Sequence, residues 1–156
     1  MAEIVRIRAA TPNDASAIST LIRALAVRYI AQEFPADAAN RLLGSMEESA
    51  IQGYMASAYR YHVAEERHQL AGVVAVRDNR HLYHLFVSEH FQGRGLAREL
   101  WEVAKAASLD AGNSGVFTVN SSRYAVGMYE KFGFVRQAEV VDAAGVICIP
   151  MKLEPT

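Results

Sequence analysis

The spacing of hydrophobic residues changes at Tyr59, and this change constrains the fold more than any other feature of the sequence. Before this position, apolar residues recur every three or four positions, which predicts an amphipathic helix. They are Ile18, Leu21, Ile22, Leu25 and Tyr29. From Tyr59 onward the period is two, and turn residues separate apolar runs at 59–63, 70–76 and 81–87. The pattern predicts three adjacent antiparallel strands that follow a helical region.

The C-terminal half alternates between helical and strand signals, which predicts a strand, a helix and a parallel strand in succession. Either Ser121 or Ser122 can cap the second helix of this half. In chain order, the other expected elements are a strand at 4–8, weaker helical segments within 36–55, a helix at 96–107, a strand at 116–119, a helix ending near 132, and closing strands at 134–141 and 146–153. This order predicts a mixed, three-layer α/β fold rather than a purely parallel sheet.

Length, charge and cysteine content limit the classes of function. The 156 residues match the usual size of one domain, so we expect a single domain over 1–156. A formal net charge of −1 and the lack of a basic run argue against nucleic-acid binding. No signal peptide or membrane-spanning stretch is recognisable, so we expect a cytoplasmic protein without a membrane partner. Cys148 is the only cysteine, which excludes an internal disulfide and cysteine-cluster zinc sites, and we expect no metal.

A glycine-rich turn joins the apolar run at 81–87 to the helix that follows it. The free backbone amides of a first helical turn, together with the helix dipole, attract phosphate groups. Gly93 and Gly95 permit unusual backbone angles and a close approach of a diphosphate, and Arg94 can add positive charge at the rim. An ordinary strand-to-helix turn is the alternative interpretation of this segment alone.

Two common phosphate-binding motifs do not fit this turn. The P-loop requires Gly-Lys followed by Ser or Thr, and this sequence is absent. The dinucleotide fingerprint requires a third glycine where Arg98 stands, and an acidic residue where Asn120 stands. Nucleotide hydrolysis and dinucleotide binding are therefore not predicted.

Two sequence blocks resemble the GNAT superfamily of N-acetyltransferases. Gln92, Gly95 and Ala97 match its coenzyme A motif, Gln/Arg-x-x-Gly-x-Gly/Ala. A second block resembles the superfamily pattern Asn-x4-Ala-x3-Tyr-x3-Gly-Phe, with matches at Asn120, Ala125, Tyr129, Gly133 and Phe134. The resemblance is specific over 81–134. It implies a twisted, mostly antiparallel sheet of about seven strands flanked by about four helices.

The resemblance implies acetyl-CoA as cosubstrate and assigns residues to it. On the strand that ends in Leu85, Phe86 and Val87, the last two residues would hydrogen-bond the pantetheine arm through their backbones. The backbone amides of six successive residues would hold the pyrophosphate: Gln92, Gly93, Arg94, Gly95, Leu96 and Ala97. Asn120 would bond the pantetheine from the opposite strand, and Tyr129 would lie near the thioester sulfur. Each side chain also has a structural alternative, as a core or turn residue.

The implied reaction is direct attack of a neutral amine on the acetyl thioester, with Tyr129 assisting the departing thiolate. The proton of the amine can pass to Glu89, His81, Tyr83 or His84, because the superfamily fixes no base at one motif position. His81-Leu82-Tyr83 resembles a His-Leu-His segment of the superfamily, although Tyr83 replaces its second histidine. We expect His81 to relay this proton, with the largest effect at low pH. A purely structural strand histidine is the alternative.

The acceptor is expected to be a small-molecule or peptide amine, and its pocket is expected to come from 23–55 and the loop at 142–145. The candidate residues are four acids, Glu33, Asp37, Glu47 and Glu48, and three aromatic walls, Tyr29, Phe34 and Tyr54. No residue distinguishes an amino acid, a polyamine, an aminoglycoside, a protein N-terminus or a lysine side chain. A noncatalytic acyl-CoA-binding module and an acetylating toxin acting on charged tRNA remain as alternatives. Homodimerisation is common in the superfamily, and no sequence feature specifies an interface.

Overall fold

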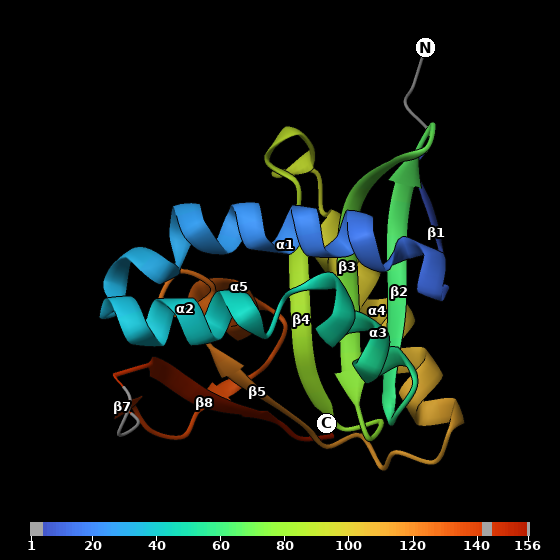
Figure 1. Ribbon diagram of the computed structural model, residues 1–156. Coiled ribbons are helices and arrows are strands. Elements are labelled where there is room, and N and C mark those ends of the chain that lie inside the picture. The colour runs from blue at the N-terminus through green and yellow to red at the C-terminus, as the bar shows by residue number, and fades with distance from the viewer. Residues whose placement is uncertain (1–4, 142–144, 156) are drawn as a thin grey trace.

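The computed structural model describes residues 5–141 and 145–155 and consists of a twisted sheet between two layers of helices (Figure 1). The strands are β1 (Arg6–Ala9), β2 (Tyr59–Glu66), β3 (Gln69–Arg77), β4 (His81–Val87), β5 (Phe117–Ser121), β6 (Val135–Arg136), β7 (Val140–Val141) and β8 (Ile147–Leu153). The α-helices are α1 (Ala15–Tyr29), α2 (Ala36–Gly44), α3 (Glu48–Met55), α4 (Leu96–Asp110) and α5 (Val126–Lys131). Short 3-10 turns are η1 (Pro12–Asp14), η2 (Ala31–Glu33) and η3 (Glu89–Phe91).

The sheet has the strand order β1-β2-β3-β4-β5-β8-β6, and β7 also pairs with β8. All neighbouring pairs among the described strands are antiparallel except β4 and β5, which are parallel. The predicted mixed, mostly antiparallel sheet is therefore confirmed. The weak helical signal over 36–55 corresponds to two helices, α2 and α3, so the described chain has five α-helices rather than about four.

Each face of the sheet has its own hydrophobic core. On one face, α1 and α3 cover the meander and bury Ile18, Ile22 and Ile51 completely. On the other face, α4 packs against the sheet and buries Leu100 and Trp101. Because apolar side chains leave water on both faces, the central strand β3 is buried along most of its length. The N-terminus of α4 is thereby held against the end of β4.

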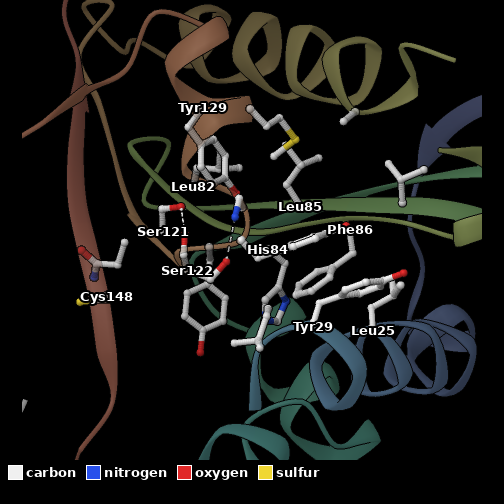
Figure 2. Close-up of a pocket in the computed structure, with 18 of the residues that line it drawn as sticks. Leu25, Tyr29, Leu82, His84, Leu85, Phe86, Ser121, Ser122, Tyr129 and Cys148 are labelled. Atoms are coloured by element: carbon white, nitrogen blue, oxygen red, sulfur yellow. Dashed lines mark hydrogen bonds between the residues drawn. The ribbon is translucent and has the colours of Figure 1, made fainter. Parts of the chain in front are cut away.

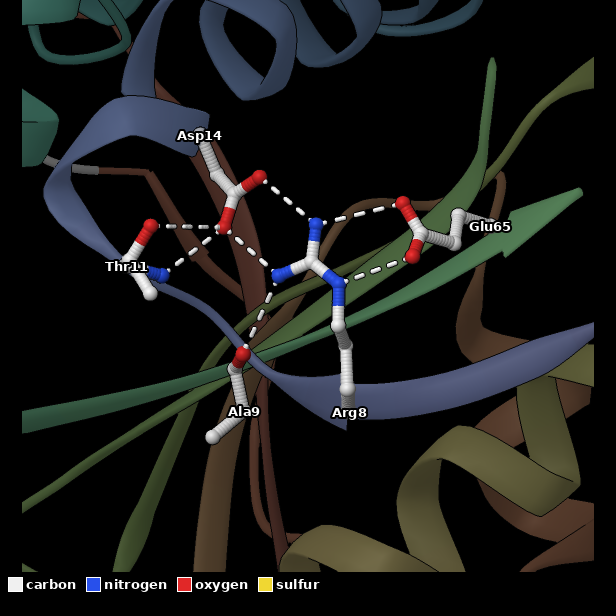
Figure 3. Close-up of polar contacts among 5 residues, drawn as sticks. All are labelled: Arg8, Ala9, Thr11, Asp14 and Glu65. Atoms are coloured by element: carbon white, nitrogen blue, oxygen red, sulfur yellow. Dashed lines mark hydrogen bonds and ion pairs between the residues drawn. The ribbon is translucent and has the colours of Figure 1, made fainter. Parts of the chain in front are cut away.

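A three-way ion pair fixes the N-terminal strand to the helical layer (Figure 3). Arg8 of β1 donates from Nη1 and Nη2 to the two carboxylate oxygens of Asp14, both at 2.9 Å. Its Nε donates to Glu65 Oε1 of β2, also at 2.9 Å. Asp14 in turn accepts the backbone N–H of Thr11 at 2.7 Å and so caps the turn that begins the helical layer. The planar guanidinium is suited to this bidentate arrangement.

We predict that Asp14→Asn destabilises the fold by about 1.5–3 kcal/mol at pH 7, the range for hydrogen bonds to charged groups. Hydrogen bonding by Arg8 lowers the pKa of Asp14 below its ordinary value. The stabilisation is thus present above the unfolded-state pKa of about 3.9 and is lost as the pH falls through the lower folded-state pKa. Urea denaturation between pH 7 and pH 3 measures both effects. Asp110→Asn, at an exposed position of α4, is the matched control; equal effects of the two variants would contradict the prediction.

Candidate active site

The parallel pair β4 and β5 separates soon after it begins. Backbone pairing joins His81 to Thr118 and Leu82 to Val119, and it extends no further between these two described strands. Beyond that point β4 stays paired with β3, while β5 stays paired with β8, so each strand is held on its outer edge. The two strands diverge visibly in Figure 1. The inner edges therefore leave a gap in the sheet with backbone groups available on its sides.

A cavity of about 740 Å³ lies at this gap and has walls on both faces of the sheet. The wall next to α1, called here the α1-side wall, consists of Leu25, Tyr29, Ile30, Phe34, Leu42, Ser45, Met46, Tyr83, His84 and Phe86. The wall next to α4 and α5, the α4-side wall, consists of Leu82, Leu85, Phe91, Gln92, Gly93, Gly95, Leu96, Ala97, Ala125, Met128 and Tyr129. The other lining residues are His81, Val87, Asn120, Ser121, Ser122, Tyr124, Val146, Ile147 and Cys148. Figure 2 shows Tyr129 and Tyr29 on opposite sides of β4.

The glycine-rich turn forms the rim of the α4-side wall. Gly93 and Gly95 both have φ of 78°, in the left-handed region, and Gly95 is the N-cap of α4. A β-carbon at either glycine would meet no atom within 4 Å, so the space in front of the turn is open. Free amides at the start of a 15-residue helix face a solvent-accessible rim, which is a suitable site for an anion.

Ten of the eleven predicted cofactor residues line the cavity; they are Leu85, Phe86, Val87, Gln92, Gly93, Gly95, Leu96, Ala97, Asn120 and Tyr129. The exception is Arg94, whose exposed guanidinium lies 5.4 Å from the ring centre of Phe91. The side chain of Gln92 donates to the carbonyl of Val87 at 3.0 Å. This bond joins the turn to the end of β4 and occupies one backbone acceptor that was expected to face the pantetheine.

The chain after β5 is built to present the helix α5 to the cavity. Ser121 donates through its hydroxyl to the carbonyl of Ser122 at 2.7 Å, and Ser122 Oγ accepts the N–H of Ala125 at 3.2 Å. Of the two serines proposed as caps, Ser122 therefore serves the entry to α5. The helix places Tyr129 in the α4-side wall, 6% exposed, with its ring edge-to-face against Phe134 at 5.7 Å. Burial raises the pKa of this phenol, so it remains protonated at neutral pH.

The candidate proton acceptors fall into two groups. His81 and Tyr83 line the cavity, whereas Glu89 lies outside it, is exposed, and pairs with Arg28 at 3.3 Å. His81 Nδ1 lies 2.7 Å from Thr118 Oγ1, at the point where β4 and β5 still pair. Burial, assisted by Arg77 and Arg80, lowers the pKa of His81 to about 4. The imidazole is therefore neutral at physiological pH.

A bulge in β4 turns two successive side chains toward α1. Ala75 of β3 pairs with His84 and Val76 pairs with Leu82, so Tyr83 is the extra residue. Tyr83 and His84 both line the cavity, and both contact the aromatic ring of Tyr54 on α3. Burial lowers the pKa of His84 to about 3, and its Nδ1 lies 3.1 Å from the Tyr61 hydroxyl. Strict alternation along the sequence would have placed Tyr83 and His84 on opposite faces.

The α1-side wall differs from the expected acceptor site. Tyr29 and Phe34 line it, and Tyr54 supports it through a 3.3 Å hydrogen bond with the Tyr83 hydroxyl. The four acidic candidates are exposed and outside the cavity; they are Glu33, Asp37, Glu47 and Glu48. The expected acceptor loop at 142–145 lies outside the described residues except for Gly145. Sequence reasoning did not identify Tyr124, which stacks on Tyr29 with ring centres 4.6 Å apart, or Cys148 as lining residues.

The described part of the chain contains neither a cluster suited to a metal ion nor a helix suited to span a membrane. No cluster of three or more His, Cys, Asp or Glu side chains there is arranged to hold a metal ion. None of the helices in residues 5–141 and 145–155 has the length and apolar character needed to cross a membrane.

Comparisons with solved structures support the fold. A GCN5-related N-acetyltransferase from Rhodopseudomonas palustris aligns with a TM-score of 0.83 and 16% identity over 99% of both chains. The PaiA N-acetyltransferase from Thermoplasma acidophilum, solved with coenzyme A, aligns with a TM-score of 0.81 and 14% identity over 97% of this chain and 99% of that chain. YncA, a putative acetyltransferase from Salmonella typhimurium solved with acetyl-CoA, aligns with a TM-score of 0.65 and 21% identity over 96% of this chain and 93% of that chain.

The family assignment comes from a family model. No curated protein matches the chain in a sequence search. The model described as an acetyltransferase (GNAT) domain matches residues 30–155, which is most of the chain. This protein belongs to the GNAT family of acetyltransferases, which are acyltransferase enzymes.

Proposed function

We propose that the protein transfers the acetyl group of acetyl-CoA to a primary amine by direct attack. The observation that carries the proposal is the gap between β4 and β5, which opens one cavity to both faces of the sheet beside the N-terminus of α4. The gap allows a cofactor on the α4 side to meet an acceptor on the α1 side. GNAT relatives solved with coenzyme A or acetyl-CoA support the choice of cosubstrate.

The residues present fit the chemical groups of coenzyme A. The amides around Gly93 and Gly95 are proposed to hold the pyrophosphate, because the turn has open space and the helix dipole favours negative charge. The inner edge of β4 at Phe86, and Asn120 at the end of β5, are proposed to bond the pantetheine amides. The thioester would then lie at the gap, within reach of both walls.

The proposed chemistry requires one proton to move from nitrogen to sulfur. The amine nitrogen forms a bond to the acetyl carbon, the carbon–sulfur bond breaks, and the sulfur leaves as a thiolate. Tyr129 is proposed to donate a proton to this thiolate and to recover one from the new amide nitrogen through water. Its buried, protonated phenol suits the donor role. Products are an N-acetylated amine and free coenzyme A, so the atoms and charges balance.

Coenzyme A at a concentration about a hundred times its dissociation constant should stabilise the protein by roughly 2.7 kcal/mol. We predict that Gly95→Ala removes most of the resulting rise in Tm, because a methyl group at the rim displaces the phosphate. Gly112→Ala is the matched control, since Gly112 also has positive φ and open space but lies at the opposite end of α4. Both variants should lose intrinsic stability, roughly 1–2 kcal/mol, because each places a side chain at positive φ. No shift for the wild type at millimolar coenzyme A would refute the assignment of the cosubstrate.

Tyr129→Phe should lower kcat by about a hundredfold or more, because it removes the proposed general acid while keeping the ring in place. Coenzyme A affinity and Tm should stay nearly unchanged, as expected for an interaction made in the transition state. Free-thiol release with a good acceptor measures the rate. Tyr59→Phe, which alters a tyrosine outside the cavity, is the control. A kcat for Tyr129→Phe within about threefold of wild type, with chemistry limiting, would exclude the donor role.

The low pKa of His81 changes how its contribution to the rate of acetyl transfer is expected to depend on pH. With a pKa of about 4, His81 is neutral from pH 6 to 9, so its loss should not act mainly at low pH. We predict that His81→Gln lowers kcat/KM by a similar factor, about tenfold, across this range. The wild-type profile should show no inflection near 6.5. Such an inflection, abolished in His81→Gln but retained in the exposed-histidine control His90→Gln, would contradict the prediction.

A further inference from the structure

The walls of the cavity carry no charged side chain among the described residues. None of the lining positions is Asp, Glu, Lys or Arg, although these types make up 21% of the sequence. The two histidines at the cavity add no charge at neutral pH, because burial lowers the pKa of His81 to about 4 and that of His84 to about 3. A site that recognised a charged acceptor would place an opposite charge in the wall.

We propose that the acceptor is a primary amine with an aromatic or apolar body and no second charged group. This inference rests on the proposed acetyl transfer and specifies its substrate class. Amino acids, polyamines and aminoglycosides carry a carboxylate or further ammonium groups, and these would lose their hydration against the α1-side wall without a partner. Arg28 of α1 lies over the ring of Tyr29 at 5.4 Å and pairs with Glu89 at 3.3 Å, and neither member of this ion pair lines the cavity.

Several polar atoms of the α1-side wall are already engaged within the protein. The Tyr83 hydroxyl donates to Tyr54 at 3.3 Å, and Tyr54 donates to the carbonyl of Ser45 at 3.0 Å. His84 bonds Tyr61 through Nδ1. The wall therefore presents mainly carbon to an acceptor. The rings of Tyr29 and Phe86 (Figure 2) line it together with the ring of Phe34. Such rings pack favourably edge-to-face or offset against an aromatic substrate.

The uncharged wall also favours the reactive form of the amine. An ammonium that moves from water to the uncharged α1-side wall gains no carboxylate partner, so its pKa falls and the free base is favoured. The free base is the nucleophile that attacks the thioester. A strong protein base is then unnecessary, in agreement with the neutral histidines and with the position of Glu89 outside the cavity. Recognition and activation of the amine follow from the same property of the wall.

A matched acceptor series tests the proposal with the full-length protein and acetyl-CoA. 2-Phenylethylamine has one amine and one ring, phenylalanine adds only a carboxylate, and spermidine replaces the ring with further ammonium groups. We expect kcat/KM for phenylalanine and for spermidine to be at least about a hundredfold lower than for 2-phenylethylamine, equal to about 2.7 kcal/mol. Equal or higher values for either charged acceptor would overturn the proposal.

Binding provides a readout that does not require turnover. 2-Phenylethylamine should raise the Tm of the coenzyme A-bound protein further, whereas phenylalanine and spermidine should not. If coenzyme A binds and 2-phenylethylamine adds this shift but is not acetylated, the transfer step fails while the substrate-class inference stands. If spermidine is acetylated and 2-phenylethylamine neither binds nor reacts, the inference fails while the transfer stands.

A charge placed in the wall should reverse the preference. Phe34→Glu introduces a carboxylate at a lining position between η2 and α2. We expect this variant to lose activity with 2-phenylethylamine and to gain at least about tenfold in kcat/KM with spermidine. Val27→Glu adds the same charge at a position of α1 that is 52% exposed and outside the cavity, so it should leave the order of acceptors unchanged. An unaltered order in a Phe34→Glu protein that still shows the coenzyme A shift would contradict the proposal.

Discussion

The limited pairing of β4 with β5 is the constraint on which the rest of the site depends. A strand can leave one edge unpaired only if its other edge and both faces hold it in place. Here β3 holds β4 and β8 holds β5, while helices cover the sheet on both faces. The pair Leu82–Val119, next to the His81–Thr118 contact, is the last position at which the two described strands meet. The free inner edges then offer backbone N–H donors and C=O acceptors to a ligand. Once a ligand bonds these groups, they are no longer unsatisfied and no longer cost free energy.

The two faces of the gap are chemically different, and the difference follows from how each is built. The α4-side rim consists of backbone amides at a helix N-terminus, where glycines leave open space, so it suits an anion. The α1-side wall consists mainly of side chains from helices and from the bulge in β4, and His84 and Tyr83 hydrogen-bond Tyr61 and Tyr54 behind it. One face thus binds through backbone geometry and the other through the shape and apolarity of side chains. This difference is the basis for the proposal that a large charged cosubstrate binds on the α4 side and an acceptor with an uncharged body on the α1 side.

The parts of the site that could be predicted from the sequence are those that depend on local backbone geometry. Gly93 and Gly95 require left-handed conformations, and the order of apolar runs specifies the strands around them. The residues on either side of the turn lie in the cavity for this reason. Arg94 and Glu89 were also singled out, but a side chain at a turn can point in several directions, and neither residue lines the cavity. Local pattern therefore identified the segment better than the individual charges.

The α1-side wall, the proposed acceptor face, could not be predicted because it depends on register and on contacts between distant segments. The bulge at Tyr83 is visible only when β4 is aligned with β3, and it alone places Tyr83 and His84 on the same side. The stacking of Tyr29 on Tyr124 joins residues that are 95 positions apart in the sequence. The acidic residues of 33–48 suit an amine by type, yet the helices and helix ends that carry them direct apolar residues inward and acids to solvent. The physics that folds this segment therefore also keeps these charges out of the α1-side wall.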